Sequence, residues 1–389
     1  MDFELGKEQR DIQKAARDFA EAEFDKDYML DLELNHKFPW ELLRKASELG
    51  FIGLDFPEEY GGAGYGLTEK ALVLEEFCRV GAGVGVSVGT SQFASKIILR
   101  SGSEAHKKKY LPLVCSGEVL PVSGSFTEPD RGSDLVTCPL STTAVKDGAD
   151  YVINGTKTFT TFADIAGFVV VLCQTDPEAN PPYRGQSTII VEKPAEQPGI
   201  SITEFAKMGW KCAATTQVSF ADVRVPRDNL VGEEGHGFYN AIGFLDEFRV
   251  EIGACGVGTA QGAFERALDY ARTRKAFGRK IGAFQAISHK LADMATSIEA
   301  ARWLVYRAAG QFDKEGKIDP KLSSMAKWYP ARLAVEVSDE AIEILGGHGY
   351  MLENEVERFY RDARMLELIE GTREIHKNTI ARSLLGKLD

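Results

Sequence analysis

The sequence predicts an α+β protein made of three parts: an N-terminal helical domain (residues 1–120), a middle antiparallel β-domain (121–232) and a C-terminal four-helix bundle (233–389). Two observations support this fold class. Apolar residues recur with helical spacing towards both ends, whereas short β-branched runs and turn residues fill the middle. With 389 residues, of which 44% are hydrophobic, the chain is long enough for two or three domains.

The N-terminal part is expected to be helical. Its first helix has an apolar face whose residues are seven, four and three positions apart: Leu5, Ile12, Ala16 and Phe19. Further helices are predicted over 68–80 and 84–100, and Ser103 is a plausible N-cap for the helix after them. Residues 1–120 are therefore expected to form helices rather than strands.

The middle part carries the signals of a β-domain. Asp147-Gly148 and Asn154-Gly155 each predict a two-residue hairpin turn, because such pairs accept the positive φ angles of tight turns. Strands are expected over three short β-branched or alternating runs: 168–173, 188–191 and 217–220. These signals favour a compact antiparallel sheet over a parallel nucleotide-binding sheet.

Long helices are predicted from about residue 235 onwards. The seam of a bundle is indicated by apolar residues four and three apart: Ile287, Leu291, Met294, Ile298, Ala301, Val305, Ala308 and Phe312. Asp319-Pro320 predicts an N-cap followed by proline at the first helical position. Gly256-Val257-Gly258 lies within a helical pattern, where close packing of helices is the expected reason for two glycines.

Composition excludes several classes of function. The chain has 46 Lys+Arg against 58 Asp+Glu, a formal charge of −12, which argues against a nucleic-acid partner. Its six cysteines are far apart and lack zinc spacing, so no metal site is expected. The polar N-terminus resembles neither a signal nor a transit peptide, and no apolar run approaches the ~20 residues needed for a membrane span. These features favour a cytoplasmic protein.

Three local strings carry possible chemistry, and each also has a plain structural meaning. The loop TEPDRGSD (127–134) offers hydroxyls and amides to an anion or a cofactor edge, or is simply a turn. The basic string RTRKAFGR (272–279) could hold a diphosphate or complement a helix dipole. Glu370-Gly371-Thr372 places a carboxylate before a helix start, where an acid also stabilises the dipole. The P-loop, GxGxxG, HExxH and GxSxG signatures are absent.

Together these strings resemble the acyl-CoA dehydrogenase family of flavoproteins over nearly the whole chain. The resemblance also rests on further strings in the same order: PEEYGG (57–62), NGTK (154–157), RKAFG (274–278), FQAI (284–287), ILGGHGY (344–350) and RDA (361–363). It implies FAD bound between the β-domain and the bundle, usually in a homotetramer. The chain departs from the common pattern at Asp130-Arg131, Phe159, Glu343 and Ile369.

The resemblance implies roles for individual residues. Those expected to contact FAD are Thr127, Phe159, Thr161, Arg274, Phe277, Gln285, Gly346, Gly347 and Thr372, with Arg274, Phe277 and Gln285 acting across a dimer interface. Those expected near the substrate are Ser133, Asp246, Phe248, Arg249, Ile369 and Gly371, with Ser133, Asp246 and Arg249 facing the CoA portion.

Glu370 is implied as the catalytic base, which would remove the α-proton of a thioester while the flavin takes hydride from the β-carbon. Desolvation between substrate and flavin is expected to raise its pKa. Other branches of the family carry a base at the position of Phe248, which cannot accept a proton. Glu247 and Glu251 flank Phe248 but should face other directions on a helix.

The predicted function is FAD-dependent dehydrogenation of an acyl-CoA to its trans-2-enoyl-CoA, with an electron-transferring flavoprotein as acceptor. Ile369 and Phe248 favour a short, branched, alicyclic or aryl acyl group. The alternatives are an acyl-CoA oxidase or an enoyl-CoA reductase on the same fold and, from a different class, a non-catalytic helical interaction protein. The completeness of the candidate site argues against the last.

Overall fold

A computed structural model describes residues 4–386. Its N-terminal part contains seven helices: α1 (Lys7–Glu23), α2 (Lys26–Leu34), α3 (Trp40–Glu48), α4 (Leu67–Val80), α5 (Ala82–Gly89), α6 (Ser95–Ser101) and α7 (Glu104–Cys115). Ser103 caps α7 as predicted, accepting a hydrogen bond from the His106 amide at 3.2 Å. The fold class predicted from the sequence is confirmed.

The single helix predicted over 84–100 is wrong, because the chain breaks between α5 and α6. Thr90 and Ser91 each donate a side-chain hydroxyl to a backbone carbonyl of the preceding turn, at 2.8 and 3.0 Å. The Ser91 carbonyl in turn accepts from the Val122 amide at 2.9 Å. Hydroxyl side chains thus offer the backbone local partners that compete with helix continuation.

The middle part is an eight-stranded sheet. Along its main path the order is β6 (Ile200–Glu204), β7 (Thr215–Pro226), β3 (Asp150–Thr161), β2 (Thr143–Asp147), β4 (Phe168–Gln174), β5 (Gln186–Glu192) and β8 (Leu230–Val231). Most pairs are antiparallel, but β1 (Ser123–Ser125) lies parallel to β4, and β2 meets β4 in parallel at one pair of residues. The sheet is therefore not wholly antiparallel as predicted.

Only one of the two predicted hairpin turns is a turn. Asp147 pairs with Asp150 across the β2–β3 turn as expected. Asn154-Gly155 instead lies inside β3, where the register with β7 shifts. Asn154 exchanges two hydrogen bonds with Asp222, at 2.9 and 3.0 Å, and a β-carbon added to Gly155 would lie 2.5 Å from the Cα of Thr142. The glycine here serves a bulge and a close approach of β2.

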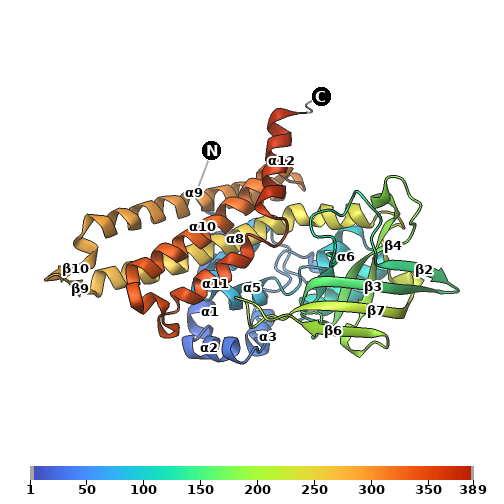
Figure 1. Ribbon diagram of the computed structural model, residues 1–389, viewed down its shortest axis with the longest axis horizontal. Coiled ribbons are helices and arrows are strands. Elements are labelled where there is room, and N and C mark those ends of the chain that lie inside the picture. The colour runs from blue at the N-terminus through green and yellow to red at the C-terminus, as the bar shows by residue number, and fades with distance from the viewer. Residues whose placement is uncertain (1–3, 387–389) are drawn as a thin grey trace.

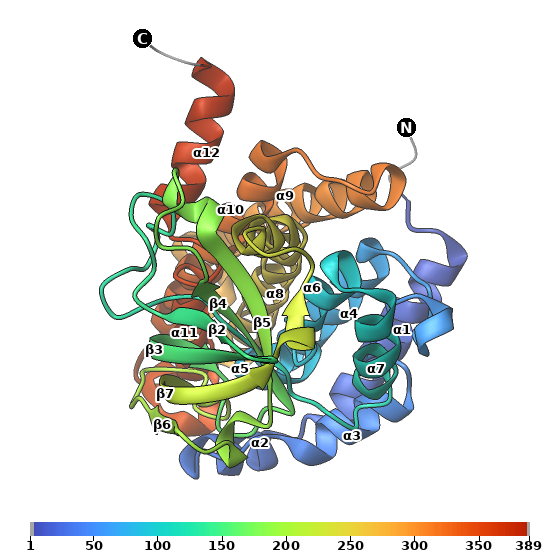
Figure 2. The ribbon, with the colours of Figure 1, turned by 90° about the vertical axis from the view of Figure 1, so that its right-hand side faces the viewer.

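The C-terminal part consists of α8 (Gly237–Thr273), α9 (Gln285–Glu315), α10 (Pro320–Leu345), α11 (Val356–Leu366) and α12 (Arg373–Leu385). A small hairpin of β9 (Lys275–Ala276) and β10 (Arg279–Lys280) joins α8 to α9. It lies at the end of the bundle opposite the large sheet, and α12 projects from the body (Figure 1, Figure 2). Asp319 caps α10 as predicted, accepting from the Lys321 amide at 2.9 Å.

Close packing holds α8 against the helices on either side. An added β-carbon at Gly256 would lie 2.9 Å from the Pro330 carbonyl carbon, and one at Gly258 would lie 2.1 Å from the Glu75 carbonyl oxygen. The predicted packing role of these glycines is confirmed. Within the described residues, no helix is both long and apolar enough to cross a membrane.

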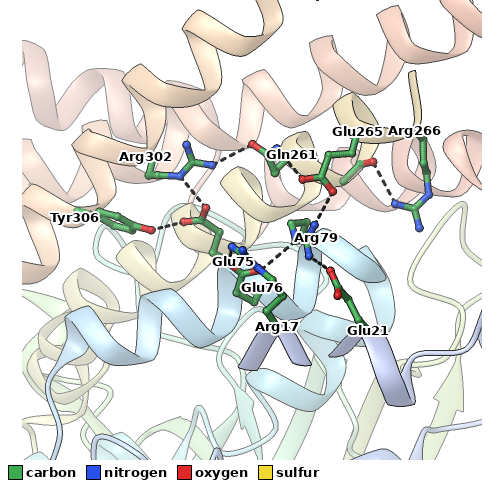
Figure 3. Close-up of polar contacts among 11 residues, drawn as sticks. Arg17, Glu21, Glu75, Glu76, Arg79, Gln261, Glu265, Arg266, Arg302 and Tyr306 are labelled. Atoms are coloured by element: carbon green, nitrogen blue, oxygen red, sulfur yellow. Dashed lines mark hydrogen bonds and ion pairs between the residues drawn. The ribbon is translucent and has the colours of Figure 1, made fainter. Parts of the chain in front are cut away.

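A polar network joins α1 and α4 to the bundle (Figure 3). Glu75 on α4 accepts hydrogen bonds from the Arg302 Nε and the Tyr306 hydroxyl of α9, both at 2.8 Å. The neighbouring Glu76 accepts from Arg17 of α1 at 2.6 Å and from Arg79 at 3.0 Å. Because both carboxylates are nearly inaccessible to solvent, these contacts fix how the N-terminal helices dock on the bundle.

Candidate active site

The Glu370 segment connects α11 to α12 in a strained conformation. Glu370 has φ of 53° and Gly371 has φ of 105°. A positive φ disfavours a side chain such as glutamate, so the surrounding structure must stabilise this backbone. Two cationic side chains do so: Arg249 of α8 donates from Nε to the Glu370 carbonyl at 3.1 Å, and Lys327 of α10 donates from Nζ to the Gly371 carbonyl at 3.0 Å.

The carboxyl group of Glu370 has an unusual affinity for its proton. Burial raises its pKa to about 7, although the charges of Lys327 and Arg249 act in the opposite direction. A carboxylate with a pKa near neutrality is a much stronger base than an ordinary glutamate while remaining largely ionised above pH 7. The residue can therefore remove a weakly acidic proton from a bound molecule.

Helix α8 presents two more predicted residues beside this segment. Asp246 accepts from Arg249 Nη1 at 2.9 Å, so it orients the guanidinium that holds Glu370. Phe248 is buried, and its ring stacks on Phe93 at 5.3 Å and on Phe244 at 5.6 Å between centroids. Phe126, next to Thr127, contacts Phe244 at 6.4 Å, which connects this aromatic cluster to the β-domain.

The glutamates that flank Phe248 face away from it, as expected from helical geometry. Glu247 and Glu251 both bind the buried Lys96 ammonium, at 2.5 and 2.6 Å, and Asp55 binds it as well. These three carboxylates lie close enough to one another for a metal ion. The Lys96 ammonium lies among the three carboxylates, and Arg100 also pairs with Glu247 at 2.5 Å, so the cluster is a buried ion-pair network.

The predicted β-domain residues lie around a bulge in β3. The Thr127 carbonyl accepts from the Thr158 amide at 2.9 Å, which places the loop at 127 beside the strand. Phe159 follows with φ of 56° and is 66% exposed, and Thr161 ends the strand opposite Thr215. The bulge thus turns the Phe159 ring out of the sheet, close in the chain to Thr161 and beside the loop that carries Thr127.

Lys157 and Glu128 form a buried pair that fixes this loop. The lysine Nζ lies 3.0 Å from Glu128 Oε1 and also donates to the Phe126 carbonyl at 3.0 Å. Glu128 accepts from the Ser141 and Thr142 amides, both at 2.7 Å. Both residues lie in strings that carry the family resemblance, but nothing in one sequence shows that the two side chains meet.

A second group of predicted residues gathers at the far end of the bundle. Arg274 caps the end of α8, Phe277 forms the tip of the β9–β10 hairpin with φ of 51° and 94% exposure, and Gln285 begins α9. Gly346 and Gly347 follow α10 in an exposed 3₁₀ turn (Gly346–Tyr350), whose His348 lies 6.0 Å from Tyr270 of α8 between ring centroids.

The two groups are far apart within one chain. Arg249 lies on α8 and Arg274 directly follows the last residue of that helix, so at about 1.5 Å per residue they are separated by roughly 38 Å. The structure therefore does not bring Arg274, Phe277, Gln285, Gly346 or Gly347 to Glu370 of the same chain. Arg274, Phe277 and Gln285 could therefore share a site with Glu370 only across an interface between chains, and that assignment stays a prediction.

The remaining predicted residues lie near one group or on the surface. Ile369 and Gly371 adjoin Glu370, and Thr372 occupies the N-cap position of α12. Ser133 is exposed in the loop after Glu128, where Asp134 orders the turn by accepting from the Val136 and Thr137 amides at 3.1 and 3.0 Å. Lys327 and His376, both buried against the Glu370 segment, were missed from the sequence.

These features suit a flavin dinucleotide together with an acyl thioester. The exposed Phe159 ring offers a flat apolar surface, and the adjacent threonines offer hydrogen bonds to a ring edge. Arg274, at an exposed hairpin rich in basic residues, can pair with a diphosphate. A strong carboxylate base on a segment bound by α8 and α10 suits removal of a proton next to a carbonyl. The fold and the site thus define a flavin-dependent oxidoreductase.

Known proteins narrow this class to one family. Residues 6–118, 123–223 and 235–385 match the families described as "Acyl-CoA dehydrogenase, N-terminal domain", "middle domain" and "C-terminal domain". The chain is 39% identical to the caffeyl-CoA reductase-Etf complex subunit CarC of Acetobacterium woodii, over 97% of this chain and 98% of that protein. It is 41% identical to an acyl-CoA dehydrogenase of Bacillus subtilis, over 97% of this chain and 98% of that protein.

Solved structures agree with the sequence relatives. The structure of butyryl-CoA dehydrogenase from Megasphaera elsdenii has a TM-score of 0.92 to this chain at 34% identity, covering 99% of this chain and 100% of that one. The chain belongs to the acyl-CoA dehydrogenase family. It is an FAD-dependent oxidoreductase that acts on the CH–CH bond of acyl-CoA thioesters, as the sequence predicted.

Proposed function

We propose that the chain oxidises a short, branched, alicyclic or aryl acyl-CoA at its α,β-bond, with Glu370 as the base. The observation that carries this proposal is the carboxylate of Glu370, whose pKa is raised to about 7 on a strained segment held by Arg249 and Lys327. Bound FAD would supply the acceptor for the hydride that leaves the β-carbon. Glu370 takes the α-proton, and backbone N–H groups of its segment stabilise the charge on the thioester oxygen.

The proposed cofactor contacts follow from the two groups of residues. Thr127, Phe159, Thr161 and Thr372 would hold the flavin in one chain, and Arg274, Phe277, Gln285, Gly346 and Gly347 would hold the dinucleotide from the far end of a second chain. Ser133, Asp246 and Arg249 would contact the CoA portion. Phe159 and Phe277 support these assignments, because each ring is largely exposed in its own chain.

The acyl group is proposed from the aromatic cluster. Phe93, Phe126, Phe244 and Phe248 come from three separate parts of the chain and meet at α8, the helix whose Arg249 binds the Glu370 carbonyl. Bulky rings shorten the space for a straight alkyl chain and offer flat surfaces to a ring or a branch. Two of the relatives fit this range, because their names specify caffeyl-CoA and butyryl-CoA.

Two partners are proposed. An electron-transferring flavoprotein is the proposed electron acceptor, which is supported by the relative that belongs to an Etf complex. A homotetramer is proposed from apolar groups on projecting elements: Phe277, Tyr350, Leu384 and Leu385 are 94%, 76%, 67% and 62% exposed. Such groups suit contact with further copies of the chain. The cytoplasmic location stays a prediction.

One experiment tests the proposed function directly. Under anaerobic conditions, a panel of straight, branched, alicyclic and aryl CoA thioesters is added to the yellow protein, and loss of flavin absorbance is followed. We expect the fastest bleaching from the short, branched or ring-containing members. A profile that peaks on straight chains of about eight to twelve carbons would overturn the assignment of the acyl group. Rapid reoxidation by oxygen would favour an oxidase, and oxidation of the reduced flavin by an enoyl-CoA would favour a reductase.

A further inference from the structure

Lys327 is an inaccessible lysine that binds the backbone next to the proposed base. It lies on α10 with a relative exposure of 0%, and its Nζ donates to the Gly371 carbonyl at 3.0 Å. A neutral carbonyl compensates poorly for the cost of burying an ammonium group. Burial accordingly lowers the pKa of Lys327 to about 7, while attraction to Glu370 opposes that change.

The other charged groups around the Lys327 ammonium are already compensated. Glu367, on the α11 side, is paired with Arg364 at 2.5 Å and lies 3.6 Å from Arg373. Arg249 of α8 is paired with Asp246 at 2.9 Å. Burial, Lys327 and Arg249 lower the pKa of His376 on α12 to about 3, so its ring is neutral. Glu370 is therefore the one uncompensated carboxylate among the described groups that act on Lys327.

We propose that Lys327 is a positioning residue for Glu370: its ammonium fixes the strained Glu370-Gly371 backbone and keeps the Glu370 carboxylate ionised before proton transfer. This inference rests on the proposed role of Glu370 as the base. It assigns two separable effects to one side chain, a hydrogen bond to the Gly371 carbonyl and a positive charge near the carboxylate. A lysine with a merely structural role would supply the first effect without the second.

Three substitutions separate these effects. Lys327→Arg keeps the charge and a donor, Lys327→Gln keeps a donor without charge, and Lys327→Met removes both. Lys70→Met is the matched control, because Lys70 is also fully buried and donates to a backbone carbonyl, that of Gly89, at 2.8 Å. The charges that act on Lys70 are chiefly those of Asp55, Glu251 and Lys96, rather than that of Glu370.

The first measurement is the pH dependence of flavin reduction in a single turnover. In the parent enzyme the rate should fall below about pH 7, where Glu370 becomes protonated. Loss of the charge raises the pKa of Glu370, so Lys327→Met and Lys327→Gln should move this acid limb upwards by about one pH unit. Lys327→Arg and Lys70→Met should leave it near the parent position.

The second measurement does not depend on turnover. Amide hydrogen exchange, read by mass spectrometry without substrate, should increase over residues 366–373 in Lys327→Met and remain close to the parent in Lys327→Arg and Lys327→Gln.

An acid limb that stays in place in Lys327→Met and Lys327→Gln would overturn the proposed charge effect. Unchanged exchange in Lys327→Met would overturn the proposed backbone role. If Lys327→Met does not fold, Lys327→Gln and Lys327→Arg decide the charge effect, and exchange in a folded Lys327→Leu decides the backbone role.

Glu370→Gln distinguishes this proposal from the proposed function. If Glu370→Gln reduces flavin at the parent rate, Glu370 is not the base and both proposals fail. If Glu370→Gln is inactive while the acid limb of Lys327→Gln is unshifted, the assignment of the base stands and the role of Lys327 is wrong.

Discussion

The network between α4 and α9 gives a stability prediction whose size follows from burial. In Arg302→Met, the aliphatic stem of the side chain is kept, but Glu75 loses the guanidinium that donates to it at 2.8 Å. The Glu75 side chain is only 4% exposed. In the variant its carboxylate would still accept from the Tyr306 hydroxyl, but it would have no counter-charge. Breaking a buried pair on one side typically costs about 3–5 kcal/mol.

This cost converts into a measurable shift of the melting temperature. With about 2.1 cal/mol/K of unfolding entropy per residue, a chain of 389 residues loses about 1 °C for each 0.8 kcal/mol. We therefore expect the apparent Tm of Arg302→Met to fall by about 4–6 °C in a thermal scan of the FAD-loaded protein. Arg332→Met is the control, because Arg332 forms an exposed i,i+4 pair with Glu336 and should change Tm by about 1 °C or less.

The pH dependence of this loss tests its cause. Burial raises the pKa of Glu75, and the Arg302 charge and hydrogen bond lower it, so Arg302→Met raises it further. A raised carboxyl pKa means that stability is greatest where the group is protonated and is lost as the pH rises through the folded pKa. The destabilisation should therefore be full near pH 8 and shrink towards pH 5, and Glu75→Gln should recover much of it in the double mutant. An equal loss at both pH values would refute the reasoning.

Three further predictions concern the site. Glu370→Gln should retain FAD and acyl-CoA binding while flavin reduction slows by about two to four orders of magnitude, since an amide cannot take up the proton; a near-parent rate in stopped flow would contradict this. Lys157→Met should leave Glu128 buried and unpaired, which lowers Tm and FAD retention, whereas Lys146→Met, which breaks an exposed pair with Glu234, should change neither appreciably. Arg274→Ala should weaken FAD retention, measured as flavin content after gel filtration, and full retention would remove the assigned contact.

Local features of the fold could be predicted because their causes lie within a few residues. The caps at Ser103 and Asp319 depend on an oxygen and an amide two or three residues away. Asn154-Gly155 was misassigned because the partner of Asn154 is Asp222, 68 residues away, and only the sheet register brings them together. The break after α5 has causes of both kinds, because the Thr90 and Ser91 hydroxyls bind carbonyls of the preceding turn and the Ser91 carbonyl accepts from the distant Val122 amide.

The residues of the candidate site also divide into those that the sequence could predict and those that it could not. Glu370, Phe159 and Arg274 could be predicted, because each lies in a short distinctive string. Lys327 carries no such signal: it is one lysine in an amphipathic helix, 44 residues from the carbonyl that it binds. Its importance depends on complete burial and on the strain at Glu370 and Gly371, and both arise only when α10 packs beside the α11–α12 connection. Spacing along a sequence cannot show either property.

The separation of Arg274 from Glu370 leads to a test of assembly. If Arg274 serves the site of a partner chain, a chain carrying Arg274→Ala and a chain carrying Glu370→Gln can together form one intact site in each mixed pair. Random association of equal amounts should then restore about a quarter of the parent sites, since half of the pairs are mixed and each contains one good site of two. Co-expression with two different tags, followed by tandem purification, isolates the mixed oligomers for measurement of bound flavin and its reduction; their fraction of intact sites should exceed a quarter, up to half for isolated mixed pairs, because oligomers of a single variant are removed. If both contacts belonged to one chain, every site in the mixture would carry a defect, and no recovery above the single variants would be seen.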